Sequence, residues 1–322
     1  MASPNSTFNQ VLSTTLYKYA DGGKLADNVF HASKLLDWLR ENGAVETVDG
    51  GNSFVFPIAY ANNSTFQAMT EWQELDFTNT QKFSAAEYGW KVYGGVALCS
   101  DLEVAQNMGA SQIQNLVKAK IENLAETAGN AINLDLYDDP SDSAKIVGLD
   151  GIIKTTDPSL ASLGGIARSS NAFWKGNVFA LNSQLTVSGM VNMYLTCTQG
   201  TNQQTDLIIT DRIGYERYEA LGHGTVSYNT PNSKNVQKAI DLGMPCSMFR
   251  GIPVIWDVDA NSGRMYFVNS KFLKVFTHKN HNFKALPAQR LEKQKGWKYE
   301  ISWLGNVCCN APRFQGVLTG LV

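Results

Sequence analysis

The most constraining feature of this sequence is a proline-free run at residues 109–137, GASQIQNLVKAKIENLAETAGNAINLDLY. Its apolar side chains recur at the spacing of one helix face: Ile113, Leu116, Val117, Ile121, Leu124, Ala128 and Ile132. At 1.5 Å per residue such a helix spans about 40 Å. The stripe does not keep strict heptads, which disfavours a coiled coil. The run therefore predicts one long amphipathic helix.

A second feature is a pair of predicted strands that cannot form a core alone. Apolar and aromatic residues alternate along both of them, at Phe54, Phe56, Ile58, Tyr60, Tyr88, Trp90 and Val92. Roughly 25 residues of polar and aromatic sequence separate the two strands. A two-stranded hairpin is marginal in water because it cannot bury both faces. We therefore expect a neighbouring domain or another subunit to cover it.

Residues from roughly 175 to 270 predict a small α/β domain, because helical and strand patterns alternate there. A helix with one apolar face is followed by the apolar strand DLIIT, and DRIGYERYEALG then forms a short helix that Gly222 ends. FRGIPVIWD comes next, and its Pro253 is unusual because proline has no N–H to donate to a sheet. The alternating apolar residues of this stretch still predict a strand, interrupted at the proline, and ANSG predicts a turn that makes it a hairpin with RMYFV.

Charge is distributed unevenly along the chain. The totals are 27 Lys plus Arg against 29 Asp plus Glu, a net charge of −2, which excludes a strong general attraction to nucleic acid or membranes. From Lys271 onward there are nine basic residues against two acidic ones, which leaves 18 against 27 for residues 1–270. Oppositely charged regions favour self-association. A solvated basic face is the plainer interpretation of the same lysines.

Cysteines and termini indicate a reducing compartment. The five cysteines are an odd number without a CxxC spacing, so a disulfide framework is not expected. Cys308 and Cys309 are adjacent and would point to opposite faces of a strand, so we expect them to be small buried residues. The N-terminus lacks the apolar core of a signal peptide, and no apolar run reaches 18 residues. We expect a protein kept in the cytoplasm, without membrane contact.

The sequence contains only weak candidates for a metal-binding or catalytic site. DVDANSG (257–263) resembles the start of a calcium loop, but Ser262 and Val268 stand where an EF-hand needs glycine and glutamate, so a turn is favoured. His278 and His281 would bind zinc only with a third ligand that the sequence does not identify. Nucleotide-binding and hydrolase motifs are not found. We predict no catalytic residue, no cofactor and no metal, and hence not an enzyme.

The order of these features resembles the major capsid proteins of tailed bacteriophages, whose fold encapsulins and the herpesvirus capsid floor share. The most specific pieces are DLIITDRIGYERYEAL, FRGIPVIWD with RMYFVNSKFLKV, and APRFQGVLTGLV. The resemblance covers nearly the whole chain and implies an α+β fold. Its expected parts are an N-terminal arm (1–28), an extended β-hairpin loop (50–96), a peripheral domain (29–49, 97–174 and 273–322) with a spine helix (109–137), and an axial domain (175–272).

The resemblance also implies a function. Copies of the chain would form the hexamers and pentamers of an icosahedral shell around double-stranded DNA, with non-specific DNA contacts. The virion would be its final location, after assembly in the host bacterial cytoplasm. A portal and decoration proteins are partners that the resemblance implies. We do not expect the family's N-terminal scaffolding domain here, which implies a separate scaffolding protein or none. The alternatives are an encapsulin-like shell, which needs a cargo-peptide pocket, and a cytoplasmic α/β enzyme.

Contacts between subunits are expected at the tip of the extended loop. Aromatic anchors and acidic residues there would meet basic residues in the tail of a neighbouring subunit. The expected contact residues are Phe66, Glu71, Trp72, Glu74, Asp76 and Phe77 in the loop, and Lys293, Lys295 and Lys298 in the tail. Some members of the family crosslink a loop lysine to a neighbour's asparagine. Here Lys82 or Lys91 and Asn306 or Asn310 would be the residues concerned.

Overall fold

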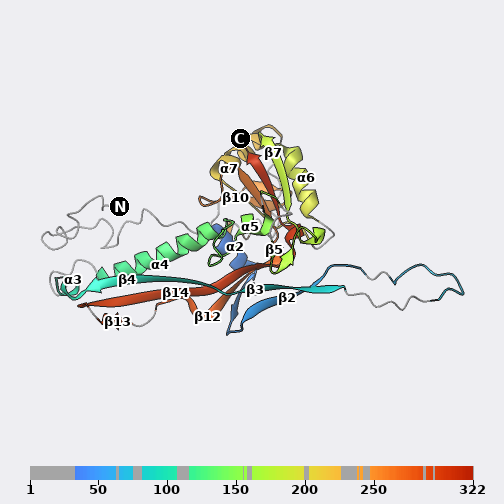
Figure 1. The fold of residues 1–322 in the computed structure, drawn as a ribbon. Coiled ribbons are helices and arrows are strands. Elements are labelled where there is room, and N and C mark those ends of the chain that lie inside the picture. Colours follow the sequence, from blue (N-terminus) through green and yellow to red (C-terminus); the bar gives the residue numbers. More distant parts are fainter. Residues whose placement is uncertain are drawn as a thin grey trace.

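The chain is built on two sheets, one long and one compact (Figure 1). The computed structural model describes residues 33–62, 65–74, 82–106, 116–154, 156–157, 162–198, 203–225, 238, 240–241, 247–285, 288–292 and 294–321. The expected N-terminal arm and residues 109–115 of the expected helix therefore lie outside the described residues. No described helix is long and apolar enough to cross a membrane.

The elements fall into four groups. The helices are α2 (Lys34–Glu41), α3 (Asp101–Gln106), α4 (Leu116–Asp135), α5 (Leu149–Ile153), α6 (Val187–Cys197) and α7 (Arg212–Thr225). The long sheet contains β1 (Val45–Val48), β4 (Lys91–Ser100), β12 (Leu273–Ala285), β13 (Gln289–Arg290) and β14 (Gly296–Cys309). The compact sheet contains β7 (Asn177–Ser183), β8 (Leu207–Thr210), β9 (Ser247–Phe249), β10 (Ile252–Trp256), β11 (Arg264–Val268) and β15 (Gly316–Leu321). The two hairpins and the short 3-10 turns are β2 (Ser53–Ala59) with β3 (Phe83–Gly89), β5 (Ser162–Leu163) with β6 (Ile166–Ala167), η2 (Ala172–Trp174), η3 (Ser270–Phe272) and η4 (Pro312–Phe314).

The long sheet carries α4 along one of its faces (Figure 1). β14 pairs antiparallel with β12 on one side and with β4 on the other. Helix and sheet approach closely at Gly95, where a Cβ atom would lie 2.7 Å from Leu124 Cδ1. Tyr93 and Trp303 pack edge to face with 5.7 Å between ring centroids. The predicted long helix is thus confirmed over Leu116–Asp135, where its apolar stripe packs against the sheet.

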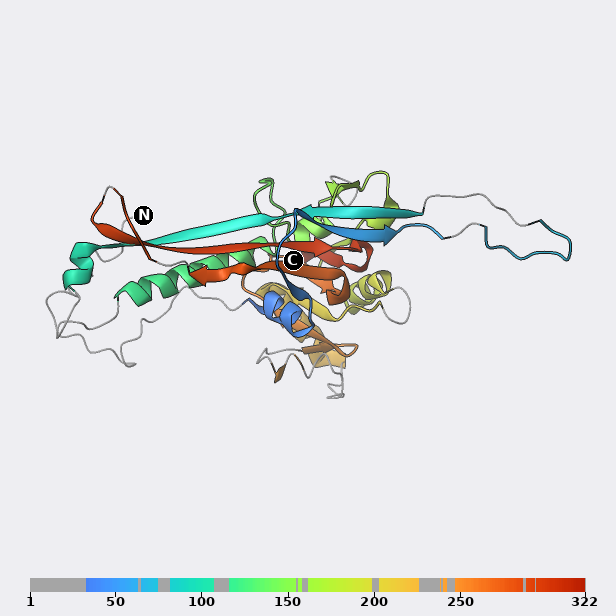
Figure 2. The ribbon, with the colours of Figure 1, turned by 90° about the horizontal axis from the view of Figure 1, so that it is seen from below.

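β2 and β3 pair antiparallel from Ser53 opposite Gly89 to Ala59 opposite Phe83, as the alternating pattern predicts. Figure 2 shows β3 continuing the line of β4, with the hairpin projecting beyond the rest of the molecule. One face of the hairpin packs against the body: Phe54, Ile58, Ala86 and Tyr88 are buried in the main core. The Tyr88 hydroxyl donates a hydrogen bond to Cys309 O at 2.6 Å.

The compact sheet has the strand order β7-β15-β11-β8-β10-β9 and is covered on both faces. One face packs against α6 and α7 through residues such as Met190, Ile208 and Phe267. The opposite face, which includes Ile209 and Tyr266, belongs to a core shared with α2, α4, α5 and the long sheet. Burial on both faces explains why DLIIT is almost entirely apolar rather than alternating.

A buried carboxylate joins the compact sheet to α5. Asp150 is 3% exposed and accepts hydrogen bonds from the Tyr266 hydroxyl at 2.7 Å and from Asn261 Nδ2 at 2.6 Å. Arg264 forms an ion pair with the same carboxylate. These partners offset the cost of burying a charge. Tyr266, Asn261 and Arg264 all lie in β11 or the turn before it, so the network fixes that turn.

The predicted hairpin between FRGIPVIWD and RMYFV is wrong. β10 and β11 do not pair with each other, because β8 lies between them, parallel to β10 and antiparallel to β11. β10 forms its hairpin with β9 instead, through Arg250 and Gly251, which have φ values of 50° and 80°. Pro253 lies one residue before Val254, where pairing with β8 begins. The proline is therefore tolerated at the start of that ladder, where its missing N–H costs least.

Two expected domain boundaries also differ from the strand pairing. β15 lies in the compact sheet, between β7 and β11, so the assignment of 273–322 to the peripheral domain is wrong for its last strand. β4 begins at Lys91 and pairs with β14, so the extended loop ends before residue 96. Both errors have one cause. Periodicity identifies a strand, but its neighbours in the sheet come from distant parts of the chain.

Candidate functional site

The tip of the β2–β3 hairpin presents large side chains that the described residues leave uncovered. Gln73 N donates a hydrogen bond to Thr70 O at 3.1 Å, and Thr70 N donates one to Gln73 Oε1 at 3.3 Å. These two bonds close a turn with Glu71 and Trp72 at its centre. Trp72 is 91% exposed, and so is Phe66. Two of the predicted aromatic anchors are therefore displayed to solvent.

The predicted acidic contacts lie beside these rings. Glu71 and Glu74 are exposed, and neither takes part in an ion pair between described residues. Asp76 and Phe77, which the sequence also predicts as contacts, lie outside the described residues. The described part of the tip thus combines two exposed rings with two carboxylates that lack a basic partner.

The predicted basic tail is partly neutralised within the chain. Lys298 Nζ lies 3.0 Å from Glu300 Oε2, Lys295 is exposed, and Lys293 lies outside the described residues. Further basic residues of the tail that pair with acidic residues of the same chain are Lys274, Lys279 and Arg290. The hairpin tip and the start of β14 lie at opposite ends of the molecule (Figure 2). A single chain therefore does not bring the acidic and basic contacts together.

Two of the residues considered for crosslinking, Asn306 and Lys91, already form hydrogen bonds within the chain. Asn306 is 3% exposed, and its Nδ2 donates a hydrogen bond to Gly89 O at 2.6 Å. Lys91 Nζ donates to Ser143 O. Asn306 thereby holds the end of β3 against the long sheet, which makes its amide a poor target for a neighbour's lysine.

The described residues contain no group of three His, Cys, Asp or Glu side chains that would hold a metal. His278 packs against His281 at 5.2 Å between ring centroids, and His281 Nδ1 lies 3.0 Å from Ser302 Oγ. In the turn that resembles a calcium loop, Asp257 Oδ2 accepts a hydrogen bond from the Tyr137 hydroxyl at 2.9 Å. That carboxylate serves to fix the turn.

The described cysteines are buried and poorly suited to nucleophilic chemistry. Burial raises the pKa of Cys197 to about 12 and that of Cys309 to about 12. Burial also raises the pKa of Cys99 and Cys308. The thiols stay protonated at neutral pH, whereas the thiolate is the nucleophile. The prediction that Cys308 and Cys309 are small buried residues is confirmed.

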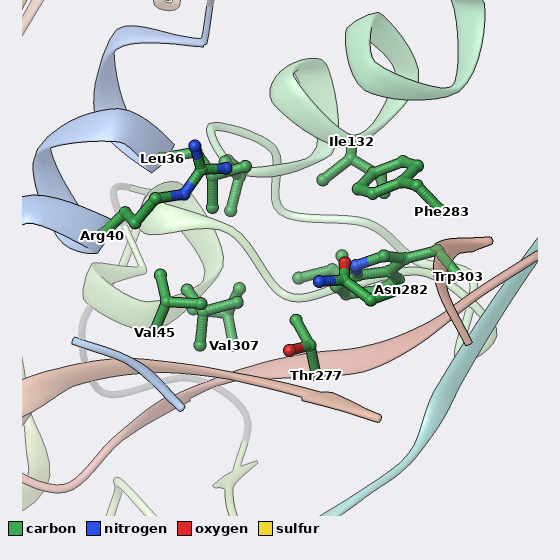
Figure 3. Close-up of a pocket in the computed structure, with 12 residues that line it drawn as sticks. Leu36, Arg40, Val45, Ile132, Thr277, Asn282, Phe283, Trp303 and Val307 are labelled. Atoms are coloured by element: carbon green, nitrogen blue, oxygen red, sulfur yellow. The ribbon is translucent and has the colours of Figure 1, made fainter. Parts of the chain in front are cut away.

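A cavity of about 150 Å³ lies between α2, α4 and the long sheet (Figure 3). Its walls are mostly apolar, with Leu36, Ile132 and Trp303 among them, and Arg40 and Thr277 add polar atoms. Ligand pockets usually measure about 300 to 1,000 Å³. This cavity is therefore small for the cargo peptide that an encapsulin-like shell requires.

A larger cavity of about 280 Å³, the root cavity, lies beside the hairpin where β2 ends, at Pro57, Ile58, Ala59 and Tyr60. Aromatic rings form much of its wall: Tyr60 stacks on Phe173 at 5.6 Å, and Phe272 stacks on Phe314 at 4.5 Å. The Arg313 guanidinium lies 4.8 Å from the Phe314 ring centroid. The sequence does not reveal this cavity, because its residues come from separate segments of the chain.

Comparison with known proteins depends on structure alone, because no family profile and no curated sequence matches this chain. A subunit of the cyanophage A-1(L) capsid matches with a TM-score of 0.68 and 16% identity over 95% of this chain and 97% of that one. A subunit of the native GTA particle capsid matches with a TM-score of 0.64 and 11% identity, over 99% of this chain and 100% of its own. The chain has the fold of tailed-phage capsid proteins.

Both matches extend over nearly the full length of each chain. The SrpI encapsulin of Synechococcus elongatus shares the fold at a TM-score of 0.53 and 9% identity, over 92% of each chain. The α+β fold class that the sequence predicts is confirmed.

Proposed function

We propose that this chain is the major capsid protein of a tailed bacteriophage. Its copies assemble into hexamers and pentamers that build an icosahedral shell around double-stranded DNA. The observation that carries this proposal is the capsid fold, which extends over nearly the whole chain. The hairpin adds support, because it leaves Phe66, Trp72 and Phe83 largely exposed, and a second subunit would cover these rings.

Each part of the chain has a place in this shell. The compact sheet with α6 and α7 is the axial domain at the centre of each hexamer or pentamer, and the long sheet with α4 is the peripheral domain. The β2–β3 hairpin lies across a neighbouring subunit. Because the net charge is only −2, contacts with DNA are local, directed to the phosphate backbone and weakened by salt.

The proposed role is structural, and the subunit supplies no catalytic residue. The protein is assembled in the cytoplasm of the host bacterium and ends in the virion. Its proposed partners are a portal protein, decoration proteins and, during assembly, either a separate scaffolding protein or none.

The test is negative-stain electron microscopy of the purified protein, expressed alone and then with its neighbouring genes. Closed icosahedral particles or hexameric rings are expected. A uniform small oligomer under both conditions contradicts the proposal and favours a cytoplasmic enzyme.

The second candidate is an encapsulin-like compartment, which the match to the SrpI encapsulin supports. Both candidate functions produce shells, so the material enclosed in the purified particles distinguishes a capsid from a compartment. Nuclease-protected double-stranded DNA inside particles from the co-expressed genes is expected for a capsid. Particles that hold a protein cargo and exclude DNA indicate a compartment instead.

A further inference from the structure

We propose that Trp72 of one subunit inserts into the root cavity of a neighbouring subunit. This contact rests on the proposed shell function and names the receiving site for the hairpin tip. Its two components lie in every copy of the chain: an exposed ring at the tip and an aromatic cavity at the root of the same hairpin.

The tip is arranged to present Trp72 as an anchor. The two hydrogen bonds between Thr70 and Gln73 hold the turn, so the ring is displayed before any contact forms. A backbone turn that is formed in advance loses less conformational entropy on binding. Tryptophan in a pocket is among the commonest strong anchors of protein interfaces. Phe66 is equally exposed but lies outside this turn.

The root cavity fits an indole ring in size and chemistry. Its volume is about 280 Å³, whereas the cavity between α2 and α4 measures about 150 Å³. Tyr60, Phe173, Phe272 and Phe314 offer ring faces and edges, and aromatic pairs gain energy at centroid separations of about 4.5 to 7 Å. An inserted Trp72 ring lies within that range of this wall.

Charge supports the same pairing. Glu71 stands next to Trp72 in the turn, and Arg313 lines the root cavity at an exposed position. Neither forms an ion pair with another described residue. With Trp72 in the cavity of a neighbour, Glu71 faces that neighbour's Arg313. Complementary charges at the edge of an interface guide association and fix its register.

The geometry makes the contact intermolecular. Trp72 is 13 residues beyond Ala59 at the end of β2, a separation that an extended chain spans in at most about 45 Å. The tip points away from its own root (Figure 2), so it reaches the cavity of another copy. A contact between two different surfaces of identical subunits runs head to tail, and a closed ring results when the rotation closes.

The first experiment is a crosslink within assembled particles. The double variant Glu71→Cys with Arg313→Cys is treated with a short bis-maleimide and separated on a denaturing gel, beside untreated and wild-type particles. A ladder of covalent oligomers is expected. Phe66→Cys with Arg313→Cys is the matched control and should give little product. Particles that assemble without the ladder overturn the docking proposal and leave the shell function intact.

The second experiment measures assembly. Trp72→Ala should raise the protein concentration at which particles form by about 30-fold or more, as for a central aromatic anchor, whereas Phe66→Ala should change it less than about 3-fold. Glu71→Arg should weaken assembly, and adding Arg313→Glu should restore it. Equal effects of Trp72→Ala and Phe66→Ala overturn the proposal. Wild-type protein that never assembles overturns the shell function itself.

Discussion

The compact sheet and the β2–β3 hairpin use similar residues and differ in what covers them. Phe267 and Ile208 in the compact sheet are 0% exposed, whereas Phe83 and Val55 in the hairpin are 70% and 58% exposed. Burying apolar surface contributes about 25 cal/mol per Å². The compact sheet therefore buries both of its faces within one chain, whereas the hairpin buries one face, at residues such as Phe54 and Ile58, and leaves Val55 and Phe83 exposed. A strand pattern in the sequence does not reveal which of these applies.

The largest expected effect on the free energy of unfolding comes from a Phe→Ala substitution in the compact sheet, compared with the same substitution in the hairpin. Phe267→Ala removes a fully buried ring and should lower the free energy of unfolding by about 3 to 5 kcal/mol. Phe66→Ala removes an exposed ring and should change it by less than about 0.5 kcal/mol. Denaturant unfolding of unassembled subunits measures both. Similar losses for the two variants would mean that the hairpin is already covered within one subunit.

A smaller loss of unfolding free energy is expected for a Gly→Ala substitution in the long sheet, on the face that α4 covers. Gly95→Ala places a Cβ atom 2.7 Å from Leu124 Cδ1, the end of a flexible side chain, so the loss should be near 1 kcal/mol. Gly94→Ala is the control, because its nearest atom, Ile301 O, would be 4.0 Å away. The same unfolding measurement applies. A loss at Gly94 as large as at Gly95 would argue against α4 packing on that face.

The smallest effect concerns an ion pair that links α3 to α4. The Lys120 ammonium, 2.9 Å from Glu103, holds the pKa of the Glu103 carboxyl below its usual value near 4.3. The pair therefore stabilises the fold above about pH 4.3 and loses this contribution as the pH falls through the lowered pKa. Both side chains are about one-third exposed, so the effect should not exceed about 0.5 kcal/mol.

Unfolding of wild type and Glu103→Gln between pH 7 and pH 3 checks this contribution. The difference between the two proteins should be present at pH 7 and shrink below about pH 4.3. A difference that stays constant over the whole range would mean that the Glu103 charge does not contribute.

The sequence predicts the parts of the fold that depend on local pattern. Helical spacing locates α4, alternation locates β2 and β3, and a continuous apolar run locates β8. The same pattern does not predict which strands pair with each other. β8 lies between β10 and β11, and β15, from the C-terminal part of the chain, pairs within the compact sheet. Ion pairs between distant parts of the chain also explain why the uneven charge of the sequence does not predict a free basic surface. Lys274 pairs with Glu46, more than 200 residues away, so a basic stretch in the sequence is not a free basic surface.

In the candidate site, too, the sequence predicts the features that depend on local pattern and not those that depend on tertiary packing. The sequence leads to Phe66 and Trp72 as expected contacts, because a polar and aromatic segment between two strands has no core of its own. The sequence does not reveal the root cavity, since Tyr60, Phe173, Phe272 and Arg313 come together only through tertiary packing. The turn that holds Trp72 depends on Gln73, whose side-chain bond to Thr70 N leaves no periodic signal.

The position of β15 has a consequence for the order of events during synthesis. β7 and β11 are made early, yet their shared neighbour consists of residues 316–321. A nascent chain that lacks those residues exposes two strand edges in the middle of the compact sheet. The sheet therefore closes only after the ribosome has translated this last strand. Translation products that end before residue 316 would lack the strand between β7 and β11 and therefore a finished compact sheet.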